Sequence, residues 1–188
     1  MKDIRPAIIL FIIFTIICGG IYPAIVTGVA QAVFPKQAQG SIITDKSGKE
    51  LGSTLIGQPF ADPKYFWPRP SAATDFGYNS MGSGGSNAGP TNPDYLKTVG
   101  DRVKALRDTG VTGTVPADLV QAAASGLDPH ITPESARLQV ARVAKARSLS
   151  EEMVVKAVSQ ATEGRQLGIL GEPRVNVLEL NLKLDAMK

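Results

Sequence analysis

The stretch from Pro6 to Pro35 contains no charged side chain, and this feature constrains the chain more than any other. Its first part, Ala7 to Ile21, reads AIILFIIFTIICGGI, with Thr15 as its polar interruption. A helix rises about 1.5 Å per residue, so twenty residues from Pro6 span about 30 Å, the thickness of the apolar core of a bilayer. Tyr22 would then lie near the interface, where amphipathic aromatic rings are favoured. The sequence therefore predicts one transmembrane helix.

Two other interpretations fit this stretch less well. A cleaved signal peptide uses an apolar region of about 7 to 15 residues, shorter than this one, although Gly28-Val29-Ala30 resembles a cleavage site. A lipoprotein anchor at Cys18 would need small residues before the cysteine, and Ile16 and Ile17 stand there instead. A retained membrane anchor fits the stretch best.

The charges beside the stretch predict its orientation. Lys2, Arg5 and the terminal amine lie on the short side, and positively charged flanks stay in the cytoplasm. We therefore expect a single-pass membrane protein with a cytoplasmic N-terminus and an extracytoplasmic main domain, although Lys36 opposes this mildly.

Small residues recur every four positions within the predicted helix, at Gly20, Ala24 and Gly28. This spacing places them on one helix face, where a second transmembrane helix could approach closely. The alternative is that small residues are common in membrane helices and that Gly19, Gly20 and Pro23 mark a kink.

The rest of the chain is long enough for one domain with its own core. We therefore divide the chain into residues 1–34, the cytoplasmic tip and membrane helix with its extension, and residues 35–188, an α+β domain. The formal charge is +3, and the two cations and one anion before residue 6 supply +1 of it. The remaining charge of about +2 is too small and dispersed for nucleic acid binding. The single cysteine lies in the apolar stretch, so the domain must fold without disulfides.

The second part of the chain predicts a mixture of helices and strands. Two β-prone runs, residues 41–44 and 51–56, flank a Ser-Gly turn and predict a hairpin. Residues 57–93 are rich in Pro and Gly but contain large aromatic residues, among them Phe60, Tyr65, Phe66, Trp67 and Phe76, which predicts an ordered irregular loop. Helices are expected from Asn92 to Gly110, from Thr114 to Gly126, from Thr132, and from Ser150 to Gly164. Alternating leucines predict a final half-buried strand over residues 174–184, with a bulge or a buried stretch near Val177 and Leu178.

The predicted fold class is therefore α+β. It consists of one N-terminal transmembrane helix followed by a single extracytoplasmic domain of about four helices, with a hairpin and a C-terminal strand.

Four stretches of this chain resemble signature segments of one family. They read YFWPRPSA from Tyr65, SGGSNAGPTNP from Ser83, SGLDPHITPESA from Ser125 and LGEPRVNVL from Leu170. Their order and unusual composition are similar to the C subunit of the bacterial Kdp potassium-transporting P-type ATPase, and the similarity runs from the N-terminal helix to the last predicted strand.

The resemblance implies an accessory, non-enzymatic, single-span subunit of a high-affinity, ATP-driven potassium import complex in the bacterial inner (plasma) membrane. It implies three partners: a channel-like potassium-conducting subunit, a P-type ATPase subunit and a small accessory membrane subunit. It also implies that this subunit stabilises the assembly and acts as a catalytic chaperone that raises the ATP affinity of the hydrolysing subunit. ATP, magnesium and potassium would be handled by the complex, with no cofactor of the chain's own. The alternative is a free-standing, membrane-anchored extracytoplasmic binding protein or chaperone.

The residues themselves argue against an active site in this chain. Residues 82–89 are glycine-rich but lack the Gly-Lys-Ser/Thr ending of a phosphate loop. His130 with Asp128 and Glu134 could suggest a metal, but an Asx turn beside a helix cap is the commoner arrangement. An extracytoplasmic domain could not touch cytoplasmic ATP, so its effect would be a coupling transmitted through membrane helices.

We therefore expect the domain to cap the potassium entrance of the conducting subunit, with residues 57–93 and 125–133 as contact surfaces. The candidate partner contacts, in the helix and in these two segments, are Gly20, Ala24, Gly28, Arg69, Ser83, Asn87, Asp128 and His130. No catalytic, cofactor-binding or metal-binding residue is predicted.

Overall fold

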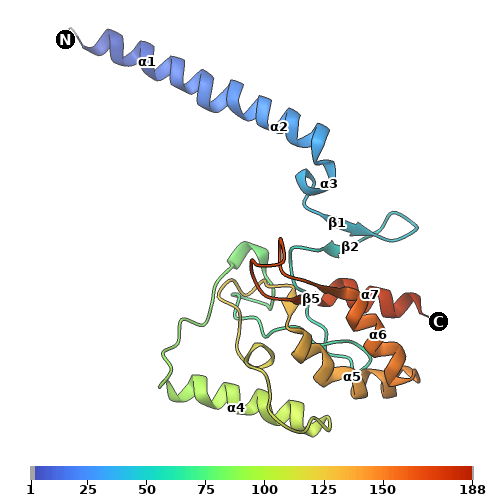
Figure 1. Cartoon of the computed structure of the whole chain (residues 1–188). Coiled ribbons are helices and arrows are strands. Elements are labelled where there is room, and N and C mark those ends of the chain that lie inside the picture. The colour runs from blue at the N-terminus through green and yellow to red at the C-terminus, as the bar shows by residue number, and fades with distance from the viewer. Residues whose placement is uncertain (1–2, 188) are drawn as a thin grey trace. The chain divides into compact units, whose positions relative to one another are not determined.

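The structure is a computed structural model and describes residues 3–187 (Figure 1). The chain forms two compact units that divide between Leu51 and Gly52. The expected division into residues 1–34 and 35–188 is a division by environment, and it stays a prediction.

The first unit is dominated by one long apolar helix. It consists of α1 (Ile4–Ile16), a π-helical turn (Ile17–Ile21) and α2 (Tyr22–Val33). The 30 residues from Ile4 to Val33 are long and apolar enough to cross a membrane, and none of them is buried by the rest of the chain. The predicted membrane-spanning helix is therefore present, while its orientation stays a prediction; Lys2 lies outside the described residues. A short helix, α3 (Pro35–Ala38), follows where the sequence predicts a break.

The π-helical turn has a cause in the sequence. Pro23 lacks an N–H group, and its ring would clash with the carbonyl group four residues earlier, at Gly19. The turn just before it is widened, and the N–H group of Tyr22 donates to the carbonyl of Ile17, five residues back. The extra residue in this turn accommodates the proline without ending the helix.

The predicted hairpin is confirmed by β1 (Ile42–Thr44) and β2 (Glu50–Ser53), which pair in a two-stranded sheet. Its turn is shaped by Asp45, whose carboxylate accepts the N–H groups of Ser47 at 2.8 Å and Lys49 at 3.0 Å. Gly48 takes a φ of 85°, a left-handed conformation that glycine adopts without strain.

The second unit contains four helices and a small antiparallel sheet. The helices are α4 (Pro93–Asp108), α5 (Pro133–Arg147), α6 (Glu151–Ala161) and α7 (Val177–Ala186). The strands are β3 (His130–Ile131), β4 (Thr162–Glu163) and β5 (Arg174–Asn176), in the order β3-β5-β4. In β5, Val175 is paired with Ile131 on one side and with Thr162 on the other. Two single 3₁₀ turns, η2 (Ser80–Gly82) and η3 (Ala117–Leu119), complete the unit.

Helices α5, α6 and α7 pack together beside the sheet, and α4 lies to one side of them (Figure 1). The core is formed by buried apolar side chains of these elements and of the loop before them. The largest of its fully buried apolar side chains are Phe66, Ile131, Leu180, Leu184, Val143, Val154, Val175 and Val177.

Three predicted helix starts are confirmed by their caps. The side chains of Asn92, Thr132 and Ser150 each accept the N–H group of the residue three positions later. Such a bond satisfies one of the N–H groups left free at a helix start. Helix α6 ends at Ala161 rather than near Gly164, because the chain continues directly into β4.

The predicted C-terminal strand is wrong over most of its length. Only Arg174–Asn176 is a strand, and Val177–Ala186 is helix α7. The Asn176 side chain accepts the Glu179 N–H group at 3.1 Å and starts the helix where a bulge or a buried stretch was expected. The buried stretch is confirmed, since Val177 and Leu178 are 2% and 3% exposed. Val177, Leu180, Asn181 and Leu184 form the buried face at helical spacing. The alternation of leucines predicts a strand only if Asn181 lies on the exposed side, and Asn181 is 1% exposed.

The predicted helix from Thr114 to Gly126 is also wrong. Only the single 3₁₀ turn at Ala117–Leu119 forms. The Asp118 carboxylate accepts the Thr132 N–H group at 2.8 Å, and the Arg102 guanidinium donates to the Val120 carbonyl at 2.9 Å. These hydrogen bonds to distant parts of the chain take the place of the main-chain hydrogen bonds that a longer helix would have made. The predicted mixed α and β fold with one apolar N-terminal helix is therefore confirmed. The fourth helix of the second unit is α7, and not the expected helix from Thr114 to Gly126.

Candidate functional site

The irregular loop from Gly57 to Pro93 is held by two buried amide side chains. Gln139 on α5 accepts the Trp67 N–H group at 2.7 Å and donates to the Trp67 carbonyl at 3.1 Å. Asn181 on α7 accepts the Phe66 N–H group at 2.8 Å and donates to the Phe66 carbonyl at 3.0 Å. Each amide therefore satisfies both polar groups of a loop residue that has no strand partner. The predicted ordered loop is confirmed, with Phe66 and Trp67 fixed in place, while Phe76 is exposed.

Arg142 supports the same segment from α5. Its guanidinium donates to the carbonyls of Pro63 at 2.6 Å and Tyr65 at 3.0 Å, and lies 4.1 Å from the ring centre of Trp67. Burial lowers the pKa of Arg142 to about 10, against the opposing charge of Asp62. A planar guanidinium suits this arrangement because it stacks on the ring and donates in several directions.

The same loop is attached to the turn that precedes α5. The Ser71 hydroxyl donates to the Gly126 carbonyl at 2.7 Å, and the Ser83 hydroxyl donates to the Ser125 carbonyl at 3.0 Å. Gly126 has a φ of 67°, and a Cβ atom there would lie 2.7 Å from the Gly84 carbonyl oxygen. The loop and the turn therefore form one joined surface that requires glycine at its centre.

Arg69, Asp128 and His130 meet at the edge of this surface. The Arg69 guanidinium lies 3.0 Å from one oxygen of the Asp128 carboxylate, and the other oxygen accepts the His130 N–H group at 3.0 Å. The His130 Nδ1 atom lies 3.3 Å from that second oxygen. Burial alone would raise the pKa of Asp128, but the bonds from His130 and the charge of Arg69 outweigh it, so the pKa lies below its usual value. The expected Asx turn at Asp128 is confirmed.

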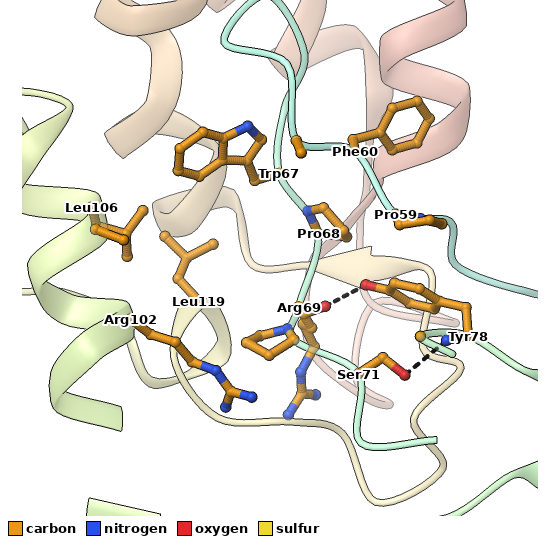
Figure 2. Close-up of a pocket in the computed structure, with 14 residues that line it drawn as sticks. Pro59, Phe60, Trp67, Pro68, Arg69, Ser71, Tyr78, Arg102, Leu106 and Leu119 are labelled. Carbon is orange, nitrogen blue, oxygen red and sulfur yellow. Dashed lines mark hydrogen bonds between the residues drawn. The ribbon is translucent and has the colours of Figure 1, made fainter. Parts of the chain in front are cut away.

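Tyr78 extends this cluster into the loop. Its hydroxyl donates to the Arg69 carbonyl, and its N–H group donates to the Ser71 hydroxyl at 2.9 Å (Figure 2). Burial, together with the charge of Asp128, raises the pKa of Tyr78, with Arg69 acting in the opposite direction. The phenol is therefore neutral and acts as a fixed donor.

An apolar cleft of about 480 Å³ lies between the loop and helix α4 (Figure 2). Phe60, Trp67, Leu106 and Leu119 provide apolar walls, and the guanidinium-bearing side chains of Arg69 and Arg102 also line it. Arg69 in addition lines a neighbouring polar hollow with Asp128, His130, Glu172 and Arg174. The arrangement can bind an apolar group next to a polar or acidic one. It offers no nucleophile paired with a base, since the hydroxyl of Ser71 is engaged with main-chain groups.

Of the predicted contacts in the domain, the structure brings together Arg69, Asp128 and His130, and it joins Ser83 to the same turn. Asn87 makes none of these contacts among residues 3–187; it is exposed with a φ of 50°, which asparagine tolerates. In the long helix, Gly20 and Ala24 line a shallow hollow with Thr15 and Gly19, and Gly28 does not. No group of three or more metal-ligating side chains is gathered in the described part of the chain.

The sequence interpretation missed the residues that hold the loop. Gln139, Asn181, Tyr78 and Arg142 are among them. A signal existed for Gln139, because it falls between Ala136 and Val143 on the apolar face of its helix. A polar residue on such a face is expected to have a buried hydrogen-bond partner.

Comparison with known proteins gives a consistent result. The family model KdpC, described as "K+-transporting ATPase, c chain", matches residues 4–186. A protein of Geotalea uraniireducens is 72% identical over 187 residues, covering 100% of this chain and 99% of its own. Proteins of Geobacter sulfurreducens and Methylococcus capsulatus are 68% and 56% identical, with coverage of at least 99% of each chain. All three are named "Potassium-transporting ATPase KdpC subunit". The chain therefore belongs to the KdpC family, the c chain of the K+-transporting ATPase.

Proposed function

We propose that this subunit stabilises the assembled potassium transporter and acts as a catalytic chaperone that raises the ATP affinity of the hydrolysing subunit. As a KdpC chain it is an accessory component of the Kdp complex and not its catalytic subunit. The partners in this proposal are a channel-like potassium-conducting subunit, a P-type ATPase subunit and a small accessory membrane subunit.

The observation that carries the docking part of this proposal is the fixed conformation of the loop from Gly57 to Pro93. Buried amides and the turn at Ser125 to His130 hold it without regular secondary structure. A loop already ordered in the free subunit loses little conformational entropy when it binds a partner. The exposed edge of this surface carries Arg69, Asp128 and His130 beside the apolar cleft. We propose that this surface caps the potassium entrance.

The proposed placement is an inner-membrane protein with a cytoplasmic N-terminus and the second unit outside the cytoplasm. ATP, magnesium and potassium are then handled by the complex, and the subunit carries no cofactor of its own. An effect on ATP affinity is in this case a coupling free energy that passes through membrane helices rather than a direct contact.

Assembly is tested through the hollow in the long helix. The double variant Gly20→Leu and Ala24→Leu fills the face that would accept another helix, and it should release the subunit from the complex in mild detergent. The control, Ile9→Leu with Val26→Leu, changes two exposed positions of the same helix outside the hollow. Unchanged co-purification of the first variant would count against helix packing there.

The chaperone role is tested by ATP hydrolysis. The complex prepared without this subunit should need a higher ATP concentration for half-maximal hydrolysis, and adding the full chain back should lower it. Magnesium-dependent ATP binding to the full chain, detected by equilibrium dialysis, would contradict coupling through membrane helices and would indicate direct contact with ATP. A chain that brings down no stoichiometric membrane subunits would instead be a free-standing anchored binding protein.

A further inference from the structure

The connection between β4 and β5 carries an apolar tip that the rest of the described chain does not cover. Leu167, Ile169 and Leu170 are 88%, 74% and 54% exposed. They lie within four residues, and we call them the hairpin tip. Three large aliphatic side chains exposed together in this way mark an interaction site more often than single exposed residues do.

The hairpin tip is built as a defined turn. Gln166 and Leu170 exchange two main-chain hydrogen bonds, each 2.9 Å long, and so close a three-residue turn. Leu167 and Gly168 both take left-handed conformations, with φ of 54° and 78°. Glycine or asparagine would suit the first position better than leucine. The fold therefore gains nothing locally from a leucine at the most exposed position of the turn.

The base of the hairpin is anchored in the core. Val175 in β5 is fully buried, and Asn176 donates to the Thr54 carbonyl at 2.8 Å while its side chain also starts α7. Thr162 and Glu163 of β4 are paired with β5 in register. The hairpin tip is therefore presented by a fixed support.

The charges around the hairpin tip are paired with each other. Arg165 binds both carboxylate oxygens of Glu172, at 2.8 and 2.7 Å, and Arg174 binds Glu163 at 2.8 Å. Residues 164–173 contain no aromatic side chain and no lysine. Segments that bind an anionic lipid surface use unpaired basic residues and interfacial aromatics. Here the charged side chains next to the hairpin tip neutralise each other in pairs. An aliphatic tip with such surroundings fits an uncharged, apolar groove on a protein.

We propose that the hairpin tip inserts into an uncharged, apolar groove on an integral membrane subunit of the same transporter. This inference rests on the proposed function, because it needs a complex into which the chain assembles. The apolar helix Ile4–Val33 would hold the chain in the same membrane as that subunit, which raises the effective concentration of the two surfaces.

The test uses the full chain co-produced with the other transporter subunits. The variant Leu167→Asn with Ile169→Thr removes two apolar side chains, and asparagine suits the left-handed position, so the fold should be retained. The control is Leu96→Asn with Val155→Thr, at positions 54% and 46% exposed on α4 and α6. We expect the tip variant to retain its thermal midpoint and to lose about tenfold or more of the recovered partner subunits, and the control to lose none.

A second measurement identifies the occupant. A benzophenone amino acid at position 167 should cross-link to one of the other membrane subunits, identified by mass spectrometry, and one at position 96 should not. Cross-linking at position 167 to lipid alone, or full recovery of partners by the tip variant, would overturn the inference. If the wild-type chain itself recovers no partner subunit, the proposed function fails as well; if only the tip variant is unaffected, the proposed function stands.

Discussion

The side-chain amide of Asn181 forms hydrogen bonds with both main-chain polar groups of Phe66, although the two residues are 115 positions apart in the chain. Its oxygen accepts the Phe66 N–H group at 2.8 Å, and its nitrogen donates to the Phe66 carbonyl at 3.0 Å. Phe66 is fully buried, so no water can take over these bonds. The last helix of the chain therefore fixes the loop that carries the candidate site.

Asn181→Ala should leave both polar groups of Phe66 buried and unsatisfied. We expect it to lower the free energy of unfolding by about 2 to 4 kcal/mol, since each such group costs about 1 to 3 kcal/mol. Urea unfolding measures the change. Glu179→Ala, an exposed position on the same helix, is the control and should change the value by less than about 0.5 kcal/mol. Equal effects of the two variants would contradict the role of Asn181.

Arg142→Lys should not behave as a conservative substitution. Lysine cannot stack on Trp67 and donate in the same geometry to the carbonyls of Pro63 and Tyr65, so we expect a loss of about 1 to 3 kcal/mol. Trp67 is the only tryptophan in the chain, and its fluorescence reports the change directly. The emission maximum of Trp67 should shift to the red, and acrylamide should quench its fluorescence more strongly. Arg137→Lys, exposed on the same helix, should leave the emission unchanged.

Gly126→Ala should separate the loop from the turn before α5. The added methyl group would lie 2.7 Å from the Gly84 oxygen and 2.8 Å from the Ala73 nitrogen, and the φ of 67° would strain any other residue. We expect a loss of about 2 kcal/mol or more, measured by urea unfolding. Gly89→Ala meets no atom within 4 Å and has no such strain, so it should stay close to wild type. A tolerated Gly126→Ala would show that the two segments are not tightly joined.

Asp128 should make stability depend on pH in a defined direction. The pKa of Asp128 is lower in the folded chain than in the unfolded one. Its contribution to the free energy of unfolding is therefore fully present above the unfolded pKa, near 3.9, and is lost as the pH falls through the folded pKa. Asp128→Asn removes this dependence. The difference in unfolding free energy between wild type and variant should be large at pH 7 and shrink below about pH 4. Asp101→Asn, an exposed carboxylate, should show a small difference throughout. A pH-independent difference for Asp128→Asn would contradict the ion pair with Arg69.

Elements that depend on local chemistry could be predicted well. Three helix starts follow from capping side chains within three residues of the N–H groups they accept. The hairpin turn follows from Asp45 and Gly48 in the same way. The Asx turn at Asp128 follows from its own residues, whereas the meeting of Arg69 with Asp128 and His130 depends on the fold.

Elements that depend on distant partners could not be predicted in this way. The run after Arg174 alternates like a strand, and Asn181 reads as an exposed polar residue until Phe66 is placed beside it. The segment after Thr114 looks helical until Asp118 is engaged by the start of α5. Gln139 and Arg142 show their roles only with Trp67 in position.

By itself the sequence determined that the chain has one long apolar helix, because membrane partitioning is a sum of contributions from individual residues, each independent of the fold. It also determined where most helices begin, because a cap and its helix are neighbours in the chain. The tertiary structure alone decided that residues 177–186 are a helix and which buried side chains hold the loop before α4. Both depend on buried polar groups that must find partners, and those partners lie 72 and 115 residues away in the chain.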